Sequence, residues 1–362
     1  MNMAIYTAIF AGAISAFVFV FFSVPLCVFL AKRIGLIDLP QGRKQHTEET
    51  PLVGGLAIFI GYSMALVVMG EIYLWRLPLF CAWLVLIALG IWDDLGHVKV
   101  TVRVTVQILV IILLCLFSGM QLEHLGYLYG DEPVMLGGFA LPITVLGLIG
   151  IKNSINLIDG LDGLASTQIL VALSWFAILS YQNEIVLIVA LCAPLAGAVL
   201  GFLMYNLRLF KRLPRIFLGD HGSVFLGFTV GWYAIVGSQL SIPAFTPIEA
   251  VWILGLPVLD TIRVMLSRML RGISPFTPGR DHLHHLLLEY GWSSNTVLMV
   301  LFLVSLLFGG IAWMGRLLNL SEMTLFFGFL LLSLGFFVGV QSLSRRLHSF
   351  VRCGSNRGNS KL

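Results

Sequence analysis

Charged residues are scarce in this sequence. Asp, Glu, Lys and Arg make up 11 % of its 362 residues, whereas an ordinary soluble domain has about 25 %. Hydrophobic residues make up 58 %, and the mean hydropathy is +0.96. This composition excludes an ordinary water-soluble domain. We predict an integral membrane protein and expect no nucleic-acid partner.

Paired cysteines, repeats and linkers are also lacking. The five cysteines include no Cys-x-x-Cys pair, so neither a disulfide framework nor a zinc site is indicated. There is no internal repeat and no low-complexity linker. No Lys or Arg precedes the first apolar segment, as it would in a cleaved signal peptide. We therefore predict one membrane domain over residues 1–351, followed by a short, basic, disordered cytoplasmic tail over 352–362.

Long apolar segments are abundant. A helix needs about 20 mostly apolar residues to cross the hydrocarbon core, and a chain inside that core must satisfy its own backbone hydrogen bonds. An all-α polytopic membrane protein with about eleven transmembrane helices is therefore predicted. The spans are expected near residues 5–30, 52–70, 77–92, 104–119, 139–157, 164–182, 186–206, 222–240, 249–270, 297–318 and 323–343.

The positions of Lys and Arg predict the orientation of these spans, because basic residues collect in cytoplasmic loops. With eleven spans and the N-terminus outside, only Arg76 and Arg316 of the 22 Lys and Arg residues fall in outer loops. The C-terminus is then cytoplasmic. Ten or twelve spans would place some of the basic loops on the outer side.

Aspartates stand at several of the cytoplasmic span ends. Asp93 and Asp94 are adjacent at the end of the third span, although neighbouring carboxylates repel each other. Asp220 opens the eighth span in FLGDHGSVFLG, residues 217–227. There it is either a helix N-cap or a residue that holds a metal ion against a phosphate at an anion-attracting helix end. Both interpretations stay open at this point.

A third group of polar residues follows the fifth span, in KNSINLIDGLDGLAS, residues 152–166. Asn156, Asp159 and Asp162 recur at intervals of three, which on a continuous helix would place them on one face. Gly160 and Gly163 would let a ligand or another backbone segment approach closely. We predict that this loop contributes to the same cytoplasmic surface as the other aspartates.

Histidines gather in the last large cytoplasmic loop, RGISPFTPGRDHLHHLL, residues 271–287. On their own, Arg280, His282, His284 and His285 are compatible with a zinc site, a pH-sensitive loop or a solvated turn. Asp260 precedes this loop and lies within the apolar ninth span. An intramembrane carboxylate is a functional candidate by default, but it can also pair with Arg263 one turn later.

The combination of these residues favours one chemistry. Short carboxylates on helix ends suit Mg²⁺, which is usually held by one or two carboxylates together with a phosphate. Arg and His suit the phosphates of a nucleotide. We predict a metal-dependent phosphoryl-transfer site that faces the cytoplasm. A secondary transporter is the alternative of a different class, although transporters place charged residues near the midplane and show paired repeats.

Six segments between residues 51 and 285 resemble the polyprenyl-phosphate N-acetylhexosamine-1-phosphate transferases, and the match runs in order from about residue 30 to residue 300. Within that family, the last segment is similar to the bacterial branch that uses N-acetylglucosamine. Leu283 interrupts the run of three histidines that is usual in enzymes transferring the MurNAc-pentapeptide. The segments are PLVGGLAIF (51–59), WDDLG (92–96), NLIDGLDGL (156–164), FLGDHGSVFLGF (217–228), LPVLD (256–260) and SPFTPGRDHLHH (274–285).

The resemblance implies a reaction at the bacterial cytoplasmic (inner) membrane. N-acetylglucosamine 1-phosphate would pass from UDP-GlcNAc to undecaprenyl phosphate, with release of UMP, and the lipid-linked product would start a surface polysaccharide such as O-antigen. The cofactor would be Mg²⁺ or Mn²⁺, and a homodimer is implied. The sugar stays open, because GalNAc, FucNAc and the MurNAc-pentapeptide are alternatives.

The resemblance also implies roles for individual residues. Direct displacement by the lipid phosphate and a covalent aspartyl-phosphate intermediate both stay open. We further expect contacts to phosphate from Lys44, Lys99 and Arg103, each of which is also explained as a topology signal. The implied roles are metal binding for Asp220 and Asn156, catalysis for Asp93, Asp94, Asp159 and Asp162, and binding of the nucleotide sugar for Arg280, His282, His284 and His285.

Overall fold

Helices make up most of the described structure. A computed structural model of the chain describes residues 3–38, 49–70, 77–96, 98–210, 212–275, 277 and 279–358, and beyond residue 345 it describes the backbone only. The elements are α1 (Met3–Ile34), β1 (Ile37–Asp38), β2 (Thr50–Pro51), α2 (Gly54–Val68), α3 (Leu77–Gly96), α4 (Val100–Ser118), η2 (Gly137–Phe139), α5 (Ala140–Ile158), α6 (Leu164–Gln182), α7 (Val186–Asn206), α8 (Asp220–Gln239), α9 (Pro247–Ile253), α10 (Gly255–Leu270), α11 (Leu283–Glu289), α12 (Ser294–Leu317) and α13 (Glu322–Gly358).

The predicted all-α polytopic fold is confirmed. Each predicted span contains a helix, and β1 and β2 form one short antiparallel pair. Among the described residues, eight helices are long and apolar enough to cross a membrane, or nine if α9 and α10 form one span. Helix α2 has only 15 residues, and α8 has 20 but is not among the eight. The count of eleven and the topology stay predictions.

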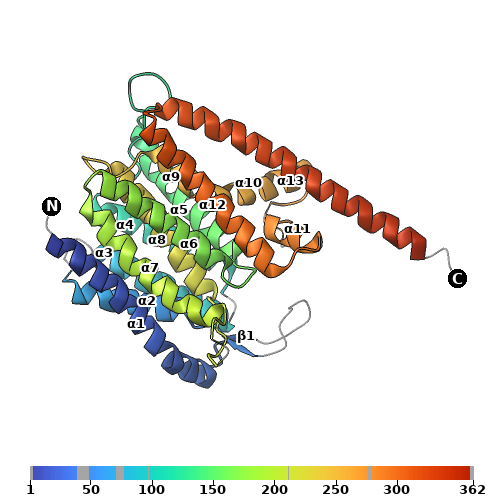
Figure 1. The fold of residues 1–362 in the computed structure, drawn as a ribbon, viewed down its shortest axis with the longest axis horizontal. Helices are drawn as coiled ribbons and strands as arrows, with labels where there is room; N and C mark the ends of the chain where they lie inside the picture. The colour runs from blue at the N-terminus through green and yellow to red at the C-terminus, as the bar shows by residue number, and fades with distance from the viewer. Residues whose placement is uncertain are drawn as a thin grey trace.

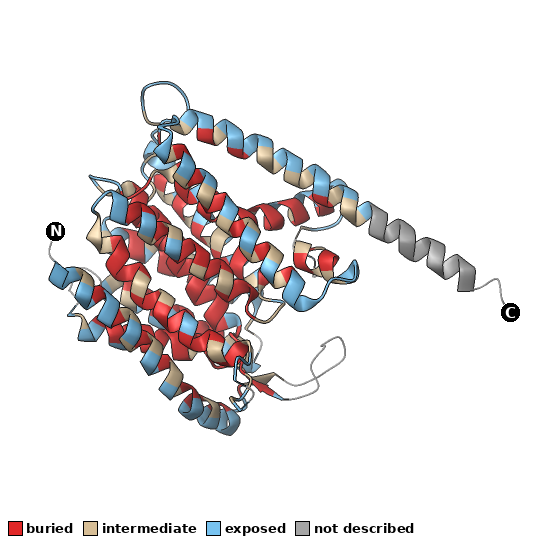
Figure 2. Cartoon of the chain, in the orientation of Figure 1, coloured by how far each residue is buried: buried red, intermediate tan, exposed pale blue. Residues whose placement is uncertain are grey.

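Helix α8 lies at the centre of the bundle. Every residue from 221 to 238 is buried, and α8 packs against α2, α3, α5 and α6. Figure 2 shows the buried interior that surrounds it. A Cβ atom added at Gly227 would lie 2.8 Å from the Cα atom of Lys152, so α5 and α8 approach closely there. Because α8 faces protein rather than lipid, it does not need a strongly apolar surface.

The peripheral helices carry the exposed apolar side chains. Phe22 on α1, Phe117 on α4 and Leu331 on α13 are all exposed. A water-soluble protein rarely exposes large contiguous apolar surfaces. These outward faces are therefore the surfaces that lipid would cover.

The ninth predicted span is not one straight helix. Helices α9 and α10 meet at an angle of 76°. Thr246 and Glu249 form a capping box at the start of α9. Pro257 lies in the first turn of α10, where its missing N–H would have no helical partner in any case. A continuous helix would instead press the proline ring against the Ile253 carbonyl, so the chain bends before Pro257.

Helix α13 extends along the edge of the bundle and packs against α9, α10 and α11 (Figure 1). Its backbone stays helical through Gly358, into the segment 352–362 where the sequence predicts a disordered tail. Residues 344–352 contain no Gly or Pro, so no helix breaker occurs in that stretch. Residues 359–362 lie outside the description.

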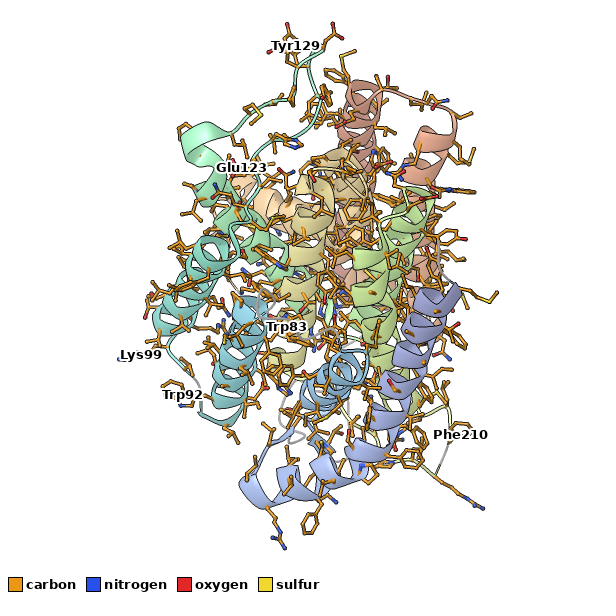
Figure 3. All side chains as sticks on the ribbon, turned by 90° about the vertical axis from the view of Figure 1, so that its left-hand side faces the viewer. Trp83, Trp92, Lys99, Glu123, Tyr129 and Phe210 are labelled. Atoms are coloured by element: carbon orange, nitrogen blue, oxygen red, sulfur yellow. The ribbon has the colours of Figure 1, made fainter. Side chains whose placement is uncertain are left out.

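The bundle has two chemically different ends. In Figure 3, Tyr129 and Glu123 lie at one end, and Lys99 and Phe210 lie toward the other. The first end carries loops that the sequence places outside, and the second carries loops that it places in the cytoplasm. The four labelled positions agree with that assignment, and the topology and the orientation in a membrane remain predictions.

Contact between α1 and α7 depends on the absence of a side chain at Gly197. A Cβ atom there would lie 2.8 Å from the carbonyl carbon of Ala13. Because that neighbour is backbone, we expect Gly197→Ala to lower the free energy of unfolding by about 1–3 kcal/mol. Thermal unfolding in detergent measures the change. The matched control is Gly150→Ala on α5, where nothing lies within 4 Å. Equal losses in both variants would contradict the prediction.

Candidate functional site

A cleft of about 1970 Å³ opens where the loops before α4, α6, α8 and α11 meet. It brings together side chains from segments far apart in the sequence, including every aspartate that the sequence analysis proposed as a catalytic or metal-binding residue. The proposed residues that line it are Asp93, Asp94, Asp159, Asp162, Asp220, Arg103, Arg280 and His285. The expected gathering of acidic and basic groups on one surface is therefore what the fold produces.

The adjacent residues Asp93 and Asp94 have different surroundings. Asp93 accepts a hydrogen bond from the backbone N–H of Val98 at 3.0 Å and forms an ion pair with Arg103. Asp94 faces α8, where the backbone N–H of Asp220 donates to its Oδ1 atom at 3.3 Å. Consecutive helical residues point about 100° apart. Asp93 therefore closes the α3–α4 turn and fixes Arg103, while Asp94 joins α3 to α8.

Asp220 and Asn156 are neighbours, as expected for a shared site. The Asn156 amide donates to Asp220 Oδ1 at 3.0 Å and to Ser223 Oγ at 2.8 Å. Asn156 belongs to α5, whereas Asp220 is the first residue of α8. These hydrogen bonds hold the Asp220 carboxylate beside the backbone N–H groups of the helix end.

The loop after α5 corrects one expectation. Asn156, Asp159 and Asp162 do not share a continuous helix face, because α5 ends at Ile158 and α6 begins at Leu164. Gly163 has φ +78°, a conformation that L-residues with side chains rarely adopt. The turn still brings Asp159 and Asp162 into the cleft, and Asp162 forms an ion pair with Arg215.

Carboxylates crowd the floor of the cleft. Burial, followed by the charges of Asp220, Asp162 and Asp94, raises the pKa of Asp159 to about 8. Among the described residues, no three His, Cys, Asp or Glu side chains form a ready-made metal cluster. Mg²⁺ commonly uses one or two carboxylates and takes its other ligands from phosphate and water. Asp220 with the Asn156 amide fits that mode, and a cation there would offset the excess negative charge.

The histidine loop is anchored by Asp260. The expected pairing with Arg263 is present: the Asp260 Oδ1 atom accepts from Arg263 Nη2 at 2.8 Å, and its Oδ2 atom lies 2.9 Å from His282 Nδ1. The backbone N–H of Leu283 also donates to Oδ1 at 3.1 Å. All three charged or titratable side chains are buried. Asp260 therefore fixes the start of α11 against α10.

The four loop residues proposed to bind the nucleotide sugar separate into two pairs. Arg280 and His285 line the cleft, whereas His282 and His284 are buried behind it. Neither ring nitrogen of His284 has a hydrogen-bond partner among the residues that the structure describes. A Cβ atom at Gly160 would lie 2.7 Å from His284 Nε2, so this ring packs directly on the aspartate turn. Of these four residues, Arg280 and His285 are therefore the two that can contact a ligand in the cleft.

The three residues proposed to contact phosphate differ in where the structure places them. Lys44 lies outside the described residues. Lys99 is exposed at the start of α4, and its neighbours Val98 and Val100 line the cleft instead. Arg103 is the one of the three that the structure places at the cleft.

Three residues were missed as site candidates in the sequence analysis. Arg215 is one of the basic residues that the sequence places in a cytoplasmic loop. It pairs with Asp162, and its guanidinium carbon lies 4.9 Å from the centre of the Phe217 ring. Lys152 is buried beside Asp93 and Asp220 and donates to Asn153 at 2.7 Å. His221 is buried against Asp94. Arg215 and His221 lie in or next to the Gly-Asp-x-Gly-Ser segment, which was the available signal.

The chain is similar to known proteins. Glycosyl transferase family 4 matches residues 76–238. Undecaprenyl-phosphate alpha-N-acetylglucosaminyl 1-phosphate transferase from Yersinia pestis is 33 % identical over 80 % of each chain. The chain belongs to glycosyl transferase family 4. Enzymes of the same name from Escherichia coli K12, 31 % identical over 78 % of this chain and 77 % of its own, and from Salmonella typhi, 30 % identical over 83 % of each, are also similar.

Membership of glycosyl transferase family 4 makes this protein an enzyme and disfavours the transporter alternative. The matched range 76–238 contains Asp93, Asp94 and the α5–α6 turn, and it includes Asp220 and nearly all of α8. It ends before α9, so the histidine loop lies beyond it. The aspartate cluster is therefore the part of the cleft that the family match covers.

The ion pair in the histidine loop generates a stability prediction. Asp260→Asn would leave the buried Arg263 guanidinium without its carboxylate, so we expect the free energy of unfolding to fall by about 3–5 kcal/mol. Thermal unfolding in detergent measures it. Asp131→Asn, at an exposed position, is the matched control and should stay within about 0.5 kcal/mol of the wild type. A loss at Asp260 no larger than the control would contradict the ion pair.

The buried ring of His284 generates a pH prediction. Burial, with the nearby charge of His285, lowers its pKa from 6.5 to about 3. Below about pH 6.5 the unfolded chain takes up a proton that the folded chain does not, so stability falls as the pH falls toward 3, by up to about 1.4 kcal/mol per pH unit. Thermal unfolding of the wild type and of His284→Gln at several pH values measures the slope. Equal slopes would contradict the prediction.

Proposed function

We propose that this family 4 glycosyltransferase transfers N-acetylglucosamine 1-phosphate from UDP-GlcNAc to undecaprenyl phosphate and releases UMP. The observation that carries the proposal is the convergence of five aspartates with Arg103, Arg280 and His285 in one cleft. The names of the similar enzymes support both the donor and the acceptor. A cleft with carboxylates and guanidinium groups suits a phosphate-rich substrate better than a neutral one.

The location of the cleft supports a cytoplasmic active site in the bacterial inner membrane. The cleft lies among the loops that carry the excess of Lys and Arg, which are cytoplasmic by the positive-inside rule. A UDP-sugar is soluble in water and would enter from that side. The polyprenyl chain would lie along the apolar helices, so its phosphate would reach the cleft at the membrane surface.

The bond changes are those of a phosphoryl transfer. An oxygen of undecaprenyl phosphate attacks the β-phosphorus of UDP-GlcNAc. The bond from that phosphorus to the oxygen bridging the two phosphates breaks, and UMP leaves with the bridging oxygen. Since the attacking oxygen is already an anion, the reaction depends mainly on positioning and charge neutralisation. A lipid-linked sugar pyrophosphate is the product.

The residues of the cleft can divide this task. Arg103 and Arg280 supply positive charge for phosphate oxygens, and Asp93 acts through Arg103 because its ion pair holds that guanidinium in place. Asp94, on α3, contacts the first residue of α8. From there it can orient the phosphate of the lipid acceptor. When bound, Mg²⁺ or Mn²⁺ supplies charge neutralisation at the pyrophosphate. Asp220, with Asn156 beside it, would hold that ion.

UMP release in detergent tests the function. With UDP-GlcNAc and Mg²⁺, we expect release from the wild type only when undecaprenyl phosphate is also present. Asp220→Asn removes the carboxylate assigned to the ion, so its rate should fall by about 100-fold. The matched control is Asp131→Asn, which changes an exposed aspartate far from the cleft in the sequence and should leave the rate unchanged.

Other outcomes point elsewhere. Release without the lipid would favour a covalent aspartyl-phosphate or hydrolytic route. Release with UDP-GalNAc or UDP-FucNAc but not UDP-GlcNAc would change the donor and keep the reaction. No release with any UDP-N-acetylhexosamine would overturn the proposed function.

A further inference from the structure

A completely buried histidine lies directly behind the aspartate cluster. His221 is the second residue of α8, and its side chain has no solvent exposure. It is not among the residues that line the cleft, yet its ring touches Asp94, which does. An imidazole in such a position has a specific partner on each nitrogen, and those partners determine what it can do.

Two hydrogen bonds determine the tautomer of His221. The backbone N–H of Leu56 donates to His221 Nε2 at 3.2 Å. A backbone amide can only donate, so Nε2 is the acceptor and carries no proton. The proton of the neutral ring is therefore on Nδ1, which lies 2.6 Å from Asp94 Oδ2. His221 donates that hydrogen bond to the carboxylate.

Three glycines lie close to His221. A Cβ atom at Gly55 on α2 would lie 2.8 Å from His221 Cδ2, and one at Gly90 on α3 would lie 2.5 Å from His221 Cβ. One at Gly219, before α8, would lie 2.6 Å from His221 Cε1. Each distance is shorter than any ordinary carbon–carbon contact. The His221 side chain therefore fits between these three segments only because none of them carries a Cβ atom at the contact.

Hydrogen bonds to both oxygens hold the Asp94 carboxylate in place. Its Oδ2 atom accepts from His221 Nδ1 and, at 3.5 Å, from the His221 backbone N–H, and its Oδ1 atom accepts from the backbone N–H of Asp220. Each carboxylate oxygen has two acceptor sites, so Oδ1 keeps one for a ligand, and Asp94 lines the cleft. Asp94 is thus oriented as an acceptor before any ligand arrives.

We propose that His221 is a positioning residue: the Leu56 amide fixes its tautomer, and its Nδ1–H group holds the Asp94 carboxylate in the orientation that the transfer reaction uses. The inference rests on the proposed function, because that function assigns the role of Asp94. His221 is not a proton relay. Its second nitrogen faces a backbone amide that cannot accept a proton, so no route leads onward from the ring.

The tautomer can be tested without any substrate. Nitrogen NMR of protein labelled with ¹⁵N at histidine separates protonated from unprotonated ring nitrogens. The His221 signals are assigned by their loss in His221→Asn. A protonated Nδ1 and an unprotonated Nε2 are expected. Protonation of Nε2, alone or together with Nδ1, would overturn the proposal, because the Leu56 amide could then not donate to the ring.

The positioning role is tested by two amide substitutions. The side-chain amide of Asn places its nitrogen near the position of Nδ1, so His221→Asn can still donate to Asp94. In His221→Gln the amide reaches the position of Nε2 and the bond to Asp94 is lost. We expect kcat within about 10-fold of the wild type for His221→Asn and about 100-fold lower for His221→Gln. The KM for UDP-GlcNAc should be unchanged in both variants.

Further measurements separate positioning from packing. In the Asp94→Asn background, His221→Gln should cause no additional loss of kcat, because the two residues act as one unit. An additive loss would overturn the proposal, as would equal kcat values for Asn and Gln in variants whose thermal unfolding matches the wild type. If a variant fails to fold, the NMR result decides. A wild type inactive with every UDP-sugar would refute the proposed function, while the NMR result would still decide the tautomer.

Discussion

Close backbone contact at the start of α8 is the constraint on which the site depends. A Cβ atom at Gly55 would lie 2.5 Å from the backbone nitrogen of Gly222, and one at Gly90 would lie 2.5 Å from His221 Cβ. Helices α2 and α3 can therefore reach α8 only because these positions lack side chains. This contact brings Asp94 to the N-terminus of α8, where backbone N–H groups and the helix dipole favour a negative charge.

Around that contact, the aspartates are tolerated because nearly every one has its own partner. Isolated buried carboxylates would be costly, but separate ion pairs and hydrogen bonds distribute the charge. Asp159 differs, since burial and neighbouring carboxylates raise its pKa. The cleft thus combines acids that have hydrogen-bond or ion-pair partners with a local excess of negative charge. The partners are Arg103 for Asp93, His221 for Asp94, Arg215 for Asp162 and Asn156 for Asp220.

Much of this arrangement follows from the sequence, and the rest depends on tertiary contacts. Apolar runs identify the helices, and the aspartates at span ends identify the cleft. The spacing of Asp159 and Asp162 was misleading as a helix period, because a glycine turn produces the same gathering. Burial of His284 and the contact between Asp260 and His282 could not be predicted, since periodicity does not show how a loop folds back onto a helix. His221 had a recognisable motif around it but no sign of its partner in Asp94.

The enclosed position of α8 also bears on how the chain enters the membrane during synthesis. The helices α2, α3, α5 and α6 that surround α8 all precede it in the chain, and of its main neighbours only α9 follows. When α8 leaves the ribosome, most of its packing partners have already been made. Its Gly, Ser and Thr residues can then meet protein surfaces instead of lipid. The order of segments thus allows a weakly apolar helix to be inserted into a scaffold that is already largely present.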